Sequence, residues 1–137
     1  MIKKLSIIYI LCISLGFSKD YTQADRILDM QRMAQAMQDI QSGFFYNNLD
    51  IVKDGAEDLK KGILNIGAIK EDKENKDVYE RWMNDSQGMT KRIQRNIANK
   101  SDIIIKRFKN GDATQALQLY SRIASECMKC HIKLRKW

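Results

Sequence analysis

Two cysteines and a histidine near the C-terminus form the part of the chain with the most distinctive chemistry. They read Cys127-Met128-Lys129-Cys130-His131, so two residues separate the thiols and the imidazole follows directly. In a helix, positions 127, 130 and 131 are related by steps of three and four and project from one face. This spacing is the attachment signature of c-type haem, in which both thiols bind the porphyrin covalently and the histidine is an axial ligand of iron. We therefore expect one covalent haem c per chain, held by Cys127, Cys130 and His131.

A structural zinc site and a redox-active disulfide are the alternative uses of this segment. Zinc needs four ligands, whereas His131 is the only histidine, and the third cysteine, Cys12, lies in a separate N-terminal segment. A thioredoxin-type Cys-x-x-Cys accompanies a strand-turn-helix unit, and the sequence shows no strand pattern. Haem is the favoured interpretation, and a disulfide in a haem-free helical interaction protein remains the alternative.

The sixth position on the iron decides what such a centre does, and three methionines are candidates for it. Met30, Met33 and Met37 are three and four residues apart, so a helix turns at least two of them inward. A thioether on iron would give a six-coordinate centre suited to electron transfer. Methionine at helical spacing is also an ordinary core residue, and both interpretations stay open.

Four amphipathic segments would position these residues. Apolar side chains recur every three or four positions in 25–45, 49–66, 78–108 and 112–134, which predicts four helices. Residues 68–77 carry seven charges and predict a solvated loop. Gly111 suits a left-handed helix end, and Asp112 suits the N-cap of the last helix. The sequence therefore predicts an all-α fold, an antiparallel four-helix bundle with haem on its C-terminal helix.

The expected buried residues of these segments follow from the same spacing. In the first helix they are Ile27, Met30, Ala34, Met37, Ile40 and Phe44. In the second helix they are Leu49, Val52, Ala56, Leu59, Ile63 and Ile66. In the third helix they are Trp82, Met89, Ile93, Ile97, Ile104 and Phe108. In the fourth helix they are Ala116, Leu117, Tyr120, Ile123, Ala124, Cys127, His131 and Leu134.

The N-terminal segment has the layout of a secretory signal peptide. Lys3 and Lys4 precede an uncharged run from Leu5 to Phe17, which is too short to span a membrane well. Cleavage after Ser18 would leave residues 19–137 as the mature domain in the periplasm, without a stable membrane anchor. An uncleaved interfacial anchor is the alternative.

Composition narrows the remaining function classes. The 137 residues carry a net charge of +7, are 44% apolar and include no proline, which disfavours both a disordered chain and a sheet protein rich in turns. Despite the positive charge, no nucleic-acid-reading motif is present. No nucleophile and base constellation is evident either, so we expect neither a nucleic-acid partner nor an enzyme.

The pattern as a whole resembles the cytochrome c-prime family, the class II c-type cytochromes. The likeness covers the whole mature chain and rests on the attachment motif followed by Arg135, on Arg26-x-x-x-Met30 in the first helix with Gly43 after it, and on Trp82. The chain departs from the family in lacking proline before that tryptophan, in a short second helix and following loop, and in having Leu134 in place of an aromatic residue.

The resemblance implies roles for these residues. It implies that His131 is the proximal ligand, that Met30 faces the distal side, and that Arg26 and Arg135 lie near the haem carboxylates; a solvated surface charge is the alternative for both arginines. Met33 or Met37 would replace Met30 if the helix register differs by a turn. The family contains low-spin electron carriers with a coordinating methionine and high-spin members that bind gases.

Two functions follow as expectations. The first is a periplasmic monohaem electron carrier with a His131 and Met30 ligand pair, whose Lys129, Lys133, Arg135 and Lys136 would attract an acidic redox partner. The second is a five-coordinate protein that binds nitric oxide or carbon monoxide. Family likeness also leads us to expect a possible homodimer.

Overall fold

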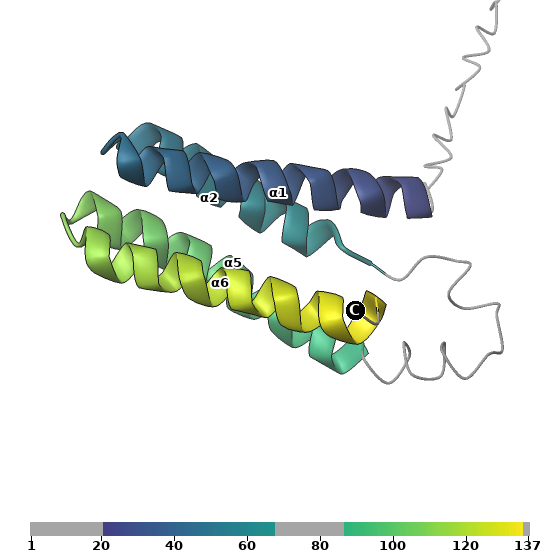
Figure 1. The fold of residues 1–137 in the computed structure, drawn as a ribbon. Helices are drawn as coiled ribbons and strands as arrows, with labels where there is room; N and C mark the ends of the chain where they lie inside the picture. The colour runs from purple at the N-terminus through teal and green to yellow at the C-terminus, as the bar shows by residue number, and fades with distance from the viewer. Residues whose placement is uncertain (1–20, 68–86, 136–137) are drawn as a thin grey trace, which may run out of the picture.

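The computed structural model describes residues 21–67 and 87–135, and these residues form a helical bundle (Figure 1). Its helices are α1 (Gln23–Phe45), α2 (Leu49–Asn65), α5 (Gln87–Lys109) and α6 (Ala113–Arg135). Within these ranges there is no strand, which confirms the predicted all-α class and the four predicted helices. The expected start of the third helix at Val78, Trp82 and the signal peptide at 1–18 lie outside the described residues.

The helix ends are fixed by local hydrogen bonds. Thr22 and Asp25 form a capping box at the start of α1, two residues before the predicted start. Asn48 caps α2, because its Oδ1 accepts hydrogen bonds from the backbone N–H groups of Asp50 and Ile51. None of the described helices is both long and apolar enough to cross a membrane.

The turn between α5 and α6 matches the expectation from its two signal residues. Gly111 has a φ of 80°, a left-handed conformation that suits glycine because it has no Cβ. Asp112 follows, and its Oδ1 accepts a hydrogen bond from the backbone N–H of Gln115 at 3.1 Å. The chain therefore leaves α5 and enters α6 within three residues.

Helix α1 packs on α2 through small residues, and this contact rotates α1 away from its predicted orientation. A Cβ on Gly55 would lie 2.9 Å from the backbone O of Ala36, so the two backbones are nearly in contact there. The buried face of α1 consists of Asp29, Met33, Ala36, Ile40 and Gly43. The predicted burial of Ile27 and Ala34 is wrong, because both side chains are exposed. Close approach at the glycines of α2 decides the rotation instead of the largest number of apolar residues.

The predicted buried residues of α2 and α5 are largely confirmed. Val52, Ala56, Leu59 and Ile63 of α2 are buried, as are four residues of α5, namely Ile93, Ile97, Ile104 and Phe108. In α6, Ala116 and Ile123 are buried, but the prediction for Leu117 is wrong, since it is 53% exposed. Leu117 lies next to the side of α6 that faces α1, where no helix covers it.

Polar contacts join α2 to α5. Gln94 Nε2 of α5 donates to the backbone O atoms of Ile63 (2.8 Å) and Ile66 (2.6 Å) at the end of α2. Lys60 Nζ of α2 lies 2.8 Å from Asp102 Oδ2 of α5. The two hydrogen bonds from Gln94 satisfy carbonyl groups at the end of α2 that have no partner inside the helix.

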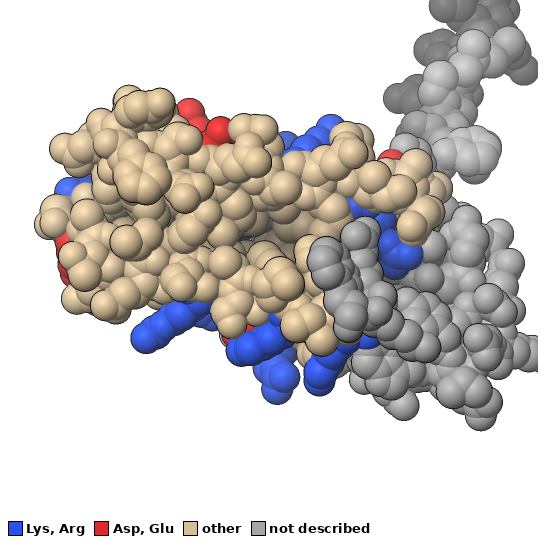
Figure 2. Space-filling view, in the orientation of Figure 1, with Lys and Arg blue, Asp and Glu red and all other residues tan. Residues whose placement is uncertain are grey.

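Three sides of the bundle are closed by extensive helix packing: α1 on α2, α2 on α5, and α5 on α6. Helices α1 and α6 are not joined in this way. Near one end of these two helices the rings of Phe44 and Tyr120 meet edge to face, with centroids 6.0 Å apart. Figure 2, which has α1 and α6 in front, shows the surface hollowed between them. We call this the α1/α6 side.

Candidate functional site

The candidate haem-attachment residues lie in the last half of α6. Cys127, Cys130 and His131 are all half-buried, and both thiols are free. The two cysteines pack against the hydrophobic core. Steps of three and four residues bring all three side chains to one face of α6, as the sequence predicted. Tyr120 lies on the same face, seven residues before Cys127.

The electrostatics of the two thiols do not match those of a redox-active pair. Burial raises the pKa of Cys127, and the neighbouring Cys130 raises it further. Burial also raises the pKa of Cys130. Redox-active Cys-x-x-Cys motifs instead have a thiol whose pKa is lowered by a helix N-terminus or a nearby cation. This difference argues against the alternative of a redox disulfide.

The structure separates the three candidate methionines of α1. Met33 is buried and faces α2, where its Cγ would lie 2.7 Å from a Cβ on Gly62. Met30 and Met37 are half-buried and belong, with Phe44, to one row of seven-residue steps. Because Phe44 contacts Tyr120 of α6, this row borders the α1/α6 side. Met33 is therefore the most buried of the three and contacts α2, whereas Met30 and Met37 are half-buried.

The basic residues near the motif do not all lie beside it. Lys129 and Lys133 are each two residues from His131, which places them about 200° around the helix axis from it. Together with Arg92 they line a groove of about 310 Å³ between α5 and α6, where Lys129 Nζ is 3.7 Å from Glu126 Oε1. Their charges therefore lie on the far side of α6 from His131.

The two arginines of the family pattern are at the same end of the bundle. Arg26 lies in the first turn of α1, and its Nη2 donates to Gln23 Oε1 at 2.6 Å. Arg135 is the last residue of α6; its side chain, like residue Lys136, lies outside the described part. Figure 1 places the first residues of α1 and the last of α6 at one end.

The α1/α6 side suits a flat, largely apolar cofactor. The residues near it include thioethers, aromatic rings, two free thiols and His131. All but His131 pack against the core, namely Met30, Met37, Phe44, Tyr120, Cys127 and Cys130. Covalent attachment needs two free thiols and an imidazole one turn from the first thiol, and Cys127, Cys130 and His131 meet these two needs. Among the described residues, no three His, Cys, Asp or Glu side chains form a group that could hold a metal ion.

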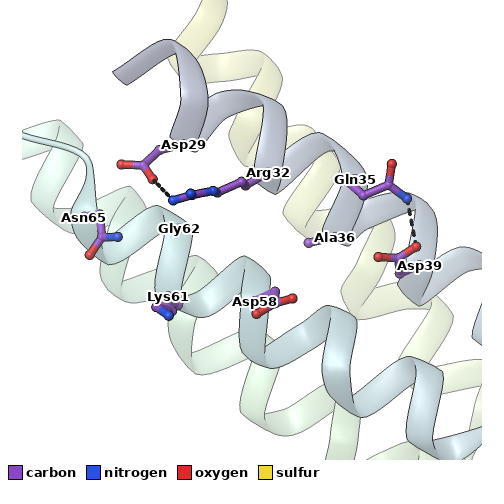
Figure 3. Close-up of a pocket in the computed structure, with 9 residues that line it drawn as sticks. All are labelled: Asp29, Arg32, Gln35, Ala36, Asp39, Asp58, Lys61, Gly62 and Asn65. Atoms are coloured by element: carbon purple, nitrogen blue, oxygen red, sulfur yellow. Dashed lines mark hydrogen bonds and ion pairs between the residues drawn. The ribbon is translucent and has the colours of Figure 1, made fainter. Parts of the chain in front are cut away.

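Sequence reasoning did not anticipate a second, polar groove between α1 and α2 (Figure 3). It has a volume of about 310 Å³ and is lined by Asp29, Arg32, Gln35, Ala36, Asp39, Asp58, Lys61, Gly62 and Asn65. Its charges are partly paired, since Arg32 Nη1 is 3.7 Å from Asp29 Oδ1. The lining comes from two helices, so no single stretch of sequence marks it.

Asp29 is the one buried charged residue among those that line the groove. It is 5% exposed, and the hydroxyl of Tyr21 donates to its Oδ2 at 3.1 Å. Burial and the Asp29 carboxylate raise the pKa of Tyr21. In the sequence, Asp29 is a charged residue at the helical spacing of Met33, Ala36 and Ile40, which face inward. That position is the one signal that a sequence search for this groove could have used.

Comparison with known proteins gives no independent assignment. No family model matches the chain, and no curated protein or solved structure is significantly similar to it.

Proposed function

We propose that this protein is an exported monohaem c-type cytochrome that carries electrons in the periplasm. One haem c is bound through Cys127 and Cys130, with His131 as an axial ligand and a methionine of α1 on the other side of the iron. The observation that carries the proposal is the position of the Cys-x-x-Cys-His face, which borders the side of the bundle that helix packing leaves open. The haem supplies reversible one-electron chemistry when it is bound.

An antiparallel bundle is part of the proposal. It is supported by the placement of the α1/α2 and α5/α6 turns at one end of the molecule and of residues 23 and 135 at the other (Figure 1). In that arrangement Phe44 and Tyr120 lie at one level along the bundle. Met37 is seven residues before Phe44, and Cys127 is seven residues after Tyr120. Each therefore lies about 10.5 Å along its helix from that level, so Met37 is level with Cys127. The same count sets His131 level with position 33 of α1.

This register favours two methionines over the third. Met33 is level with His131, but it is buried against α2. Met30 and Met37 face the correct side and lie about 4.5 Å and 6 Å along α1 from that level. Met30 is the ligand that the family resemblance implies, and Met37 is the alternative. Arg26, four residues before Met30, lies on the same face of α1 and would approach a haem carboxylate.

The chain's own residues would set the environment of the iron. Phe44, Tyr120 and Phe108 close one end of the α1/α6 side with aromatic rings and exclude water there. His131 is fixed on the inner part of α6, where the helix backbone holds its direction. A methionine thioether on iron would favour the reduced state and raise the potential.

The axial offset of Met30 and Met37 favours a second candidate function. If neither thioether reaches the iron, the centre is five-coordinate, and nitric oxide or carbon monoxide can bind at the open position. Either methionine would then pack over that position without coordinating, and the protein would bind gases instead of carrying electrons.

The optical absorption spectrum of protein made in a host that attaches haem distinguishes these functions. A low-spin spectrum that does not respond to carbon monoxide supports the electron carrier, whereas a high-spin spectrum that shifts with the gas supports the gas-binding protein. Met30→Ala, Met33→Ala and Met37→Ala should each be compared with the unsubstituted protein, and the variant that loses the low-spin spectrum identifies the ligand. Purified protein without any haem band would refute both functions.

A further inference from the structure

The surface around the α1/α6 side is formed by two rows of uncharged residues. On α1, the exposed positions next to Met30 and Met37 run from Ile27 through 31, 34, 38 and 41 to Phe45, and none of them is charged. On α6, positions 117, 121, 124, 128 and 132 form a similar row. We call these two rows the seam face.

The seam face concentrates exposed hydrophobic side chains. Nine large hydrophobic residues are exposed among the described residues, and five of them belong to these rows: Ile27, Phe45, Leu117, Met128 and Ile132. Their exposed fractions range from 45% to 79%. The rows also contain Gln31, Gln38, Gln41 and Ser121, so the seam face is uncharged throughout and apolar in part. A surface that gathers several exposed hydrophobic residues marks an interaction site more often than single exposed residues do.

The positive charge of the chain lies elsewhere. Helix α5 alone carries seven lysines and arginines and a single acid, Asp102. In Figure 2, uncharged residues cover most of α1 and α6, while many lysine and arginine side chains extend from the lower edge. A partner recognised through charge would therefore approach α5, whereas a partner that approaches the candidate haem must meet the seam face.

We infer that the seam face docks a redox protein through a matching surface that is apolar and uncharged. This inference rests on the proposed electron-carrier function and replaces the expected acidic partner by an apolar one. The contact removes one electron from the reduced cytochrome and delivers it to the partner's acceptor, with no bond made or broken and no proton moved. Apolar contact excludes water between the two centres without requiring fixed ion pairs.

The size of the seam face agrees with such a partner. The α1 row spans 19 residues, about 27 Å, and two helices side by side are about 20 Å wide, so each partner would bury about 500 Å². A total of about 1,000 Å² falls in the range of weak, transient electron-transfer complexes and below that of obligate dimers. A carrier that must release its partner quickly needs an interface of this size.

The first test measures how strongly the seam face binds an apolar surface, and its result does not depend on the iron. Met128→Lys and Ile132→Lys each add one charge to the seam face, and Ile103→Lys adds one charge to α5, where the native side chain is 41% exposed. The full chain and each variant are compared by retention on a phenyl chromatography matrix. The two seam-face variants should elute clearly earlier than Ile103→Lys. Equal retention of all three variants would overturn the inference.

The second test locates the route of the electron. The reduced, haem-loaded proteins are oxidised in low-salt buffer by hexacyanoferrate(III), an anion, and by tris(phenanthroline)cobalt(III), a cation; each accepts one electron. Because Met128→Lys and Ile103→Lys have the same net charge, a difference between them reports local charge. Met128→Lys should react about fivefold faster than Ile103→Lys with the anion and correspondingly slower with the cation.

Other results would contradict the inference in distinct ways. If only Lys129→Gln and Lys133→Gln alter the rates, electrons leave through the basic α5/α6 groove and an acidic partner is indicated. Self-association in sedimentation that Met128→Lys abolishes would make a second copy of this chain the occupant. Absence of a haem band would refute the proposed function. Retention on the phenyl matrix would still report whether the seam face binds apolar surfaces.

Discussion

Phe44 of α1 and Tyr120 of α6 meet edge to face, with ring centroids 6.0 Å apart and ring planes inclined at 77°. Phe108 of α5 lies 5.4 Å from Phe44 and completes the cluster. This cluster joins α1 to α6 at the end of the bundle opposite the candidate attachment residues. It therefore sets the separation of the two helices that border the candidate haem site.

Replacing Phe44 should weaken the bundle, because its ring is the link between α1 and the second pair of helices. We expect Phe44→Ala to lower the free energy of unfolding by about 3 kcal/mol, the lower limit for buried aromatic residues, since Phe44 is only half-buried. Urea unfolding measures the change. The matched control is Phe45→Ala, whose side chain is 79% exposed and whose loss should cost less than about 0.5 kcal/mol. Equal effects of the two variants would contradict the role of the aromatic cluster.

The close approach of α1 and α2 makes Gly55 sensitive to any side chain. A Cβ there would lie 2.9 Å from the backbone O of Ala36 and 3.0 Å from the backbone N of Ile40, neither of which can move independently. Gly55→Ala should therefore lower the free energy of unfolding by about 1–3 kcal/mol. Gly88→Ala is the control, since nothing lies within 4 Å of its added methyl group, and there the change should be neutral or stabilising by up to about 1 kcal/mol. Thermal melts of the two variants distinguish these outcomes.

The side chain of Gln94 should hold the end of α2 against α5. Its Nε2 donates to the carbonyl groups of Ile63 and Ile66, and Gln94→Ala would remove both hydrogen bonds. The expected cost is about 1–3 kcal/mol, with faster amide hydrogen exchange in the last turn of α2. Arg95→Ala, at an exposed neighbouring position, should leave both measurements nearly unchanged. An unchanged exchange rate in Gln94→Ala would mean that water replaces the amide without loss.

The two thiols should make haem-free protein less stable in alkaline solution. Burial raises the pKa of Cys127 and Cys130 above the value of 9.0 for a free thiol, so above that pH the unfolded chain loses these protons before the folded chain does. The free energy of unfolding should therefore be highest below pH 9 and should fall until the pH passes the raised pKa values of the folded state. Urea titrations across this range measure the fall.

The matched control for this pH dependence is the protein with haem attached. Thioether sulfurs cannot ionise, so the part of the alkaline loss that comes from the thiols should disappear. Tyr120, whose pKa is raised by burial and by Cys127, contributes a separate loss above pH 10 in the haem-free protein. An identical pH profile with and without haem would show that the cysteines are not titrating.

Much of the fold could be predicted from local signals. The turn between α5 and α6 followed from Gly111 and Asp112, whose backbone preference and side chain act over three or four residues. The buried residues of α2 and α5 followed from apolar spacing, because each of these helices has a single strongly apolar face. The candidate attachment residues also share a face, since that depends only on their spacing within one helix.

The orientation of α1 could not be predicted in the same way. Its apolar residues are spread around the helix, so the count of apolar contacts does not select one face. The glycines of α2 select it by allowing Ala36 and Met33 to approach closely, and this information lies in another segment of the chain. The same rotation buries Met33 more deeply than Met30 and Met37, and it leaves Ile27 exposed.

Because three sides of the bundle are packed and one is open, the α2/α5 contact is placed as a hinge between two pairs of helices. The two helix pairs, α1 with α2 and α5 with α6, are each held together by a short turn and by packing along their length. We expect the two helix pairs to move apart at the α1/α6 side and to lose little more than the contacts of Phe44. If haem is the cofactor, it would enter from this side after the helices have formed, and closure of the two helix pairs would then bring it against Cys127 and Cys130.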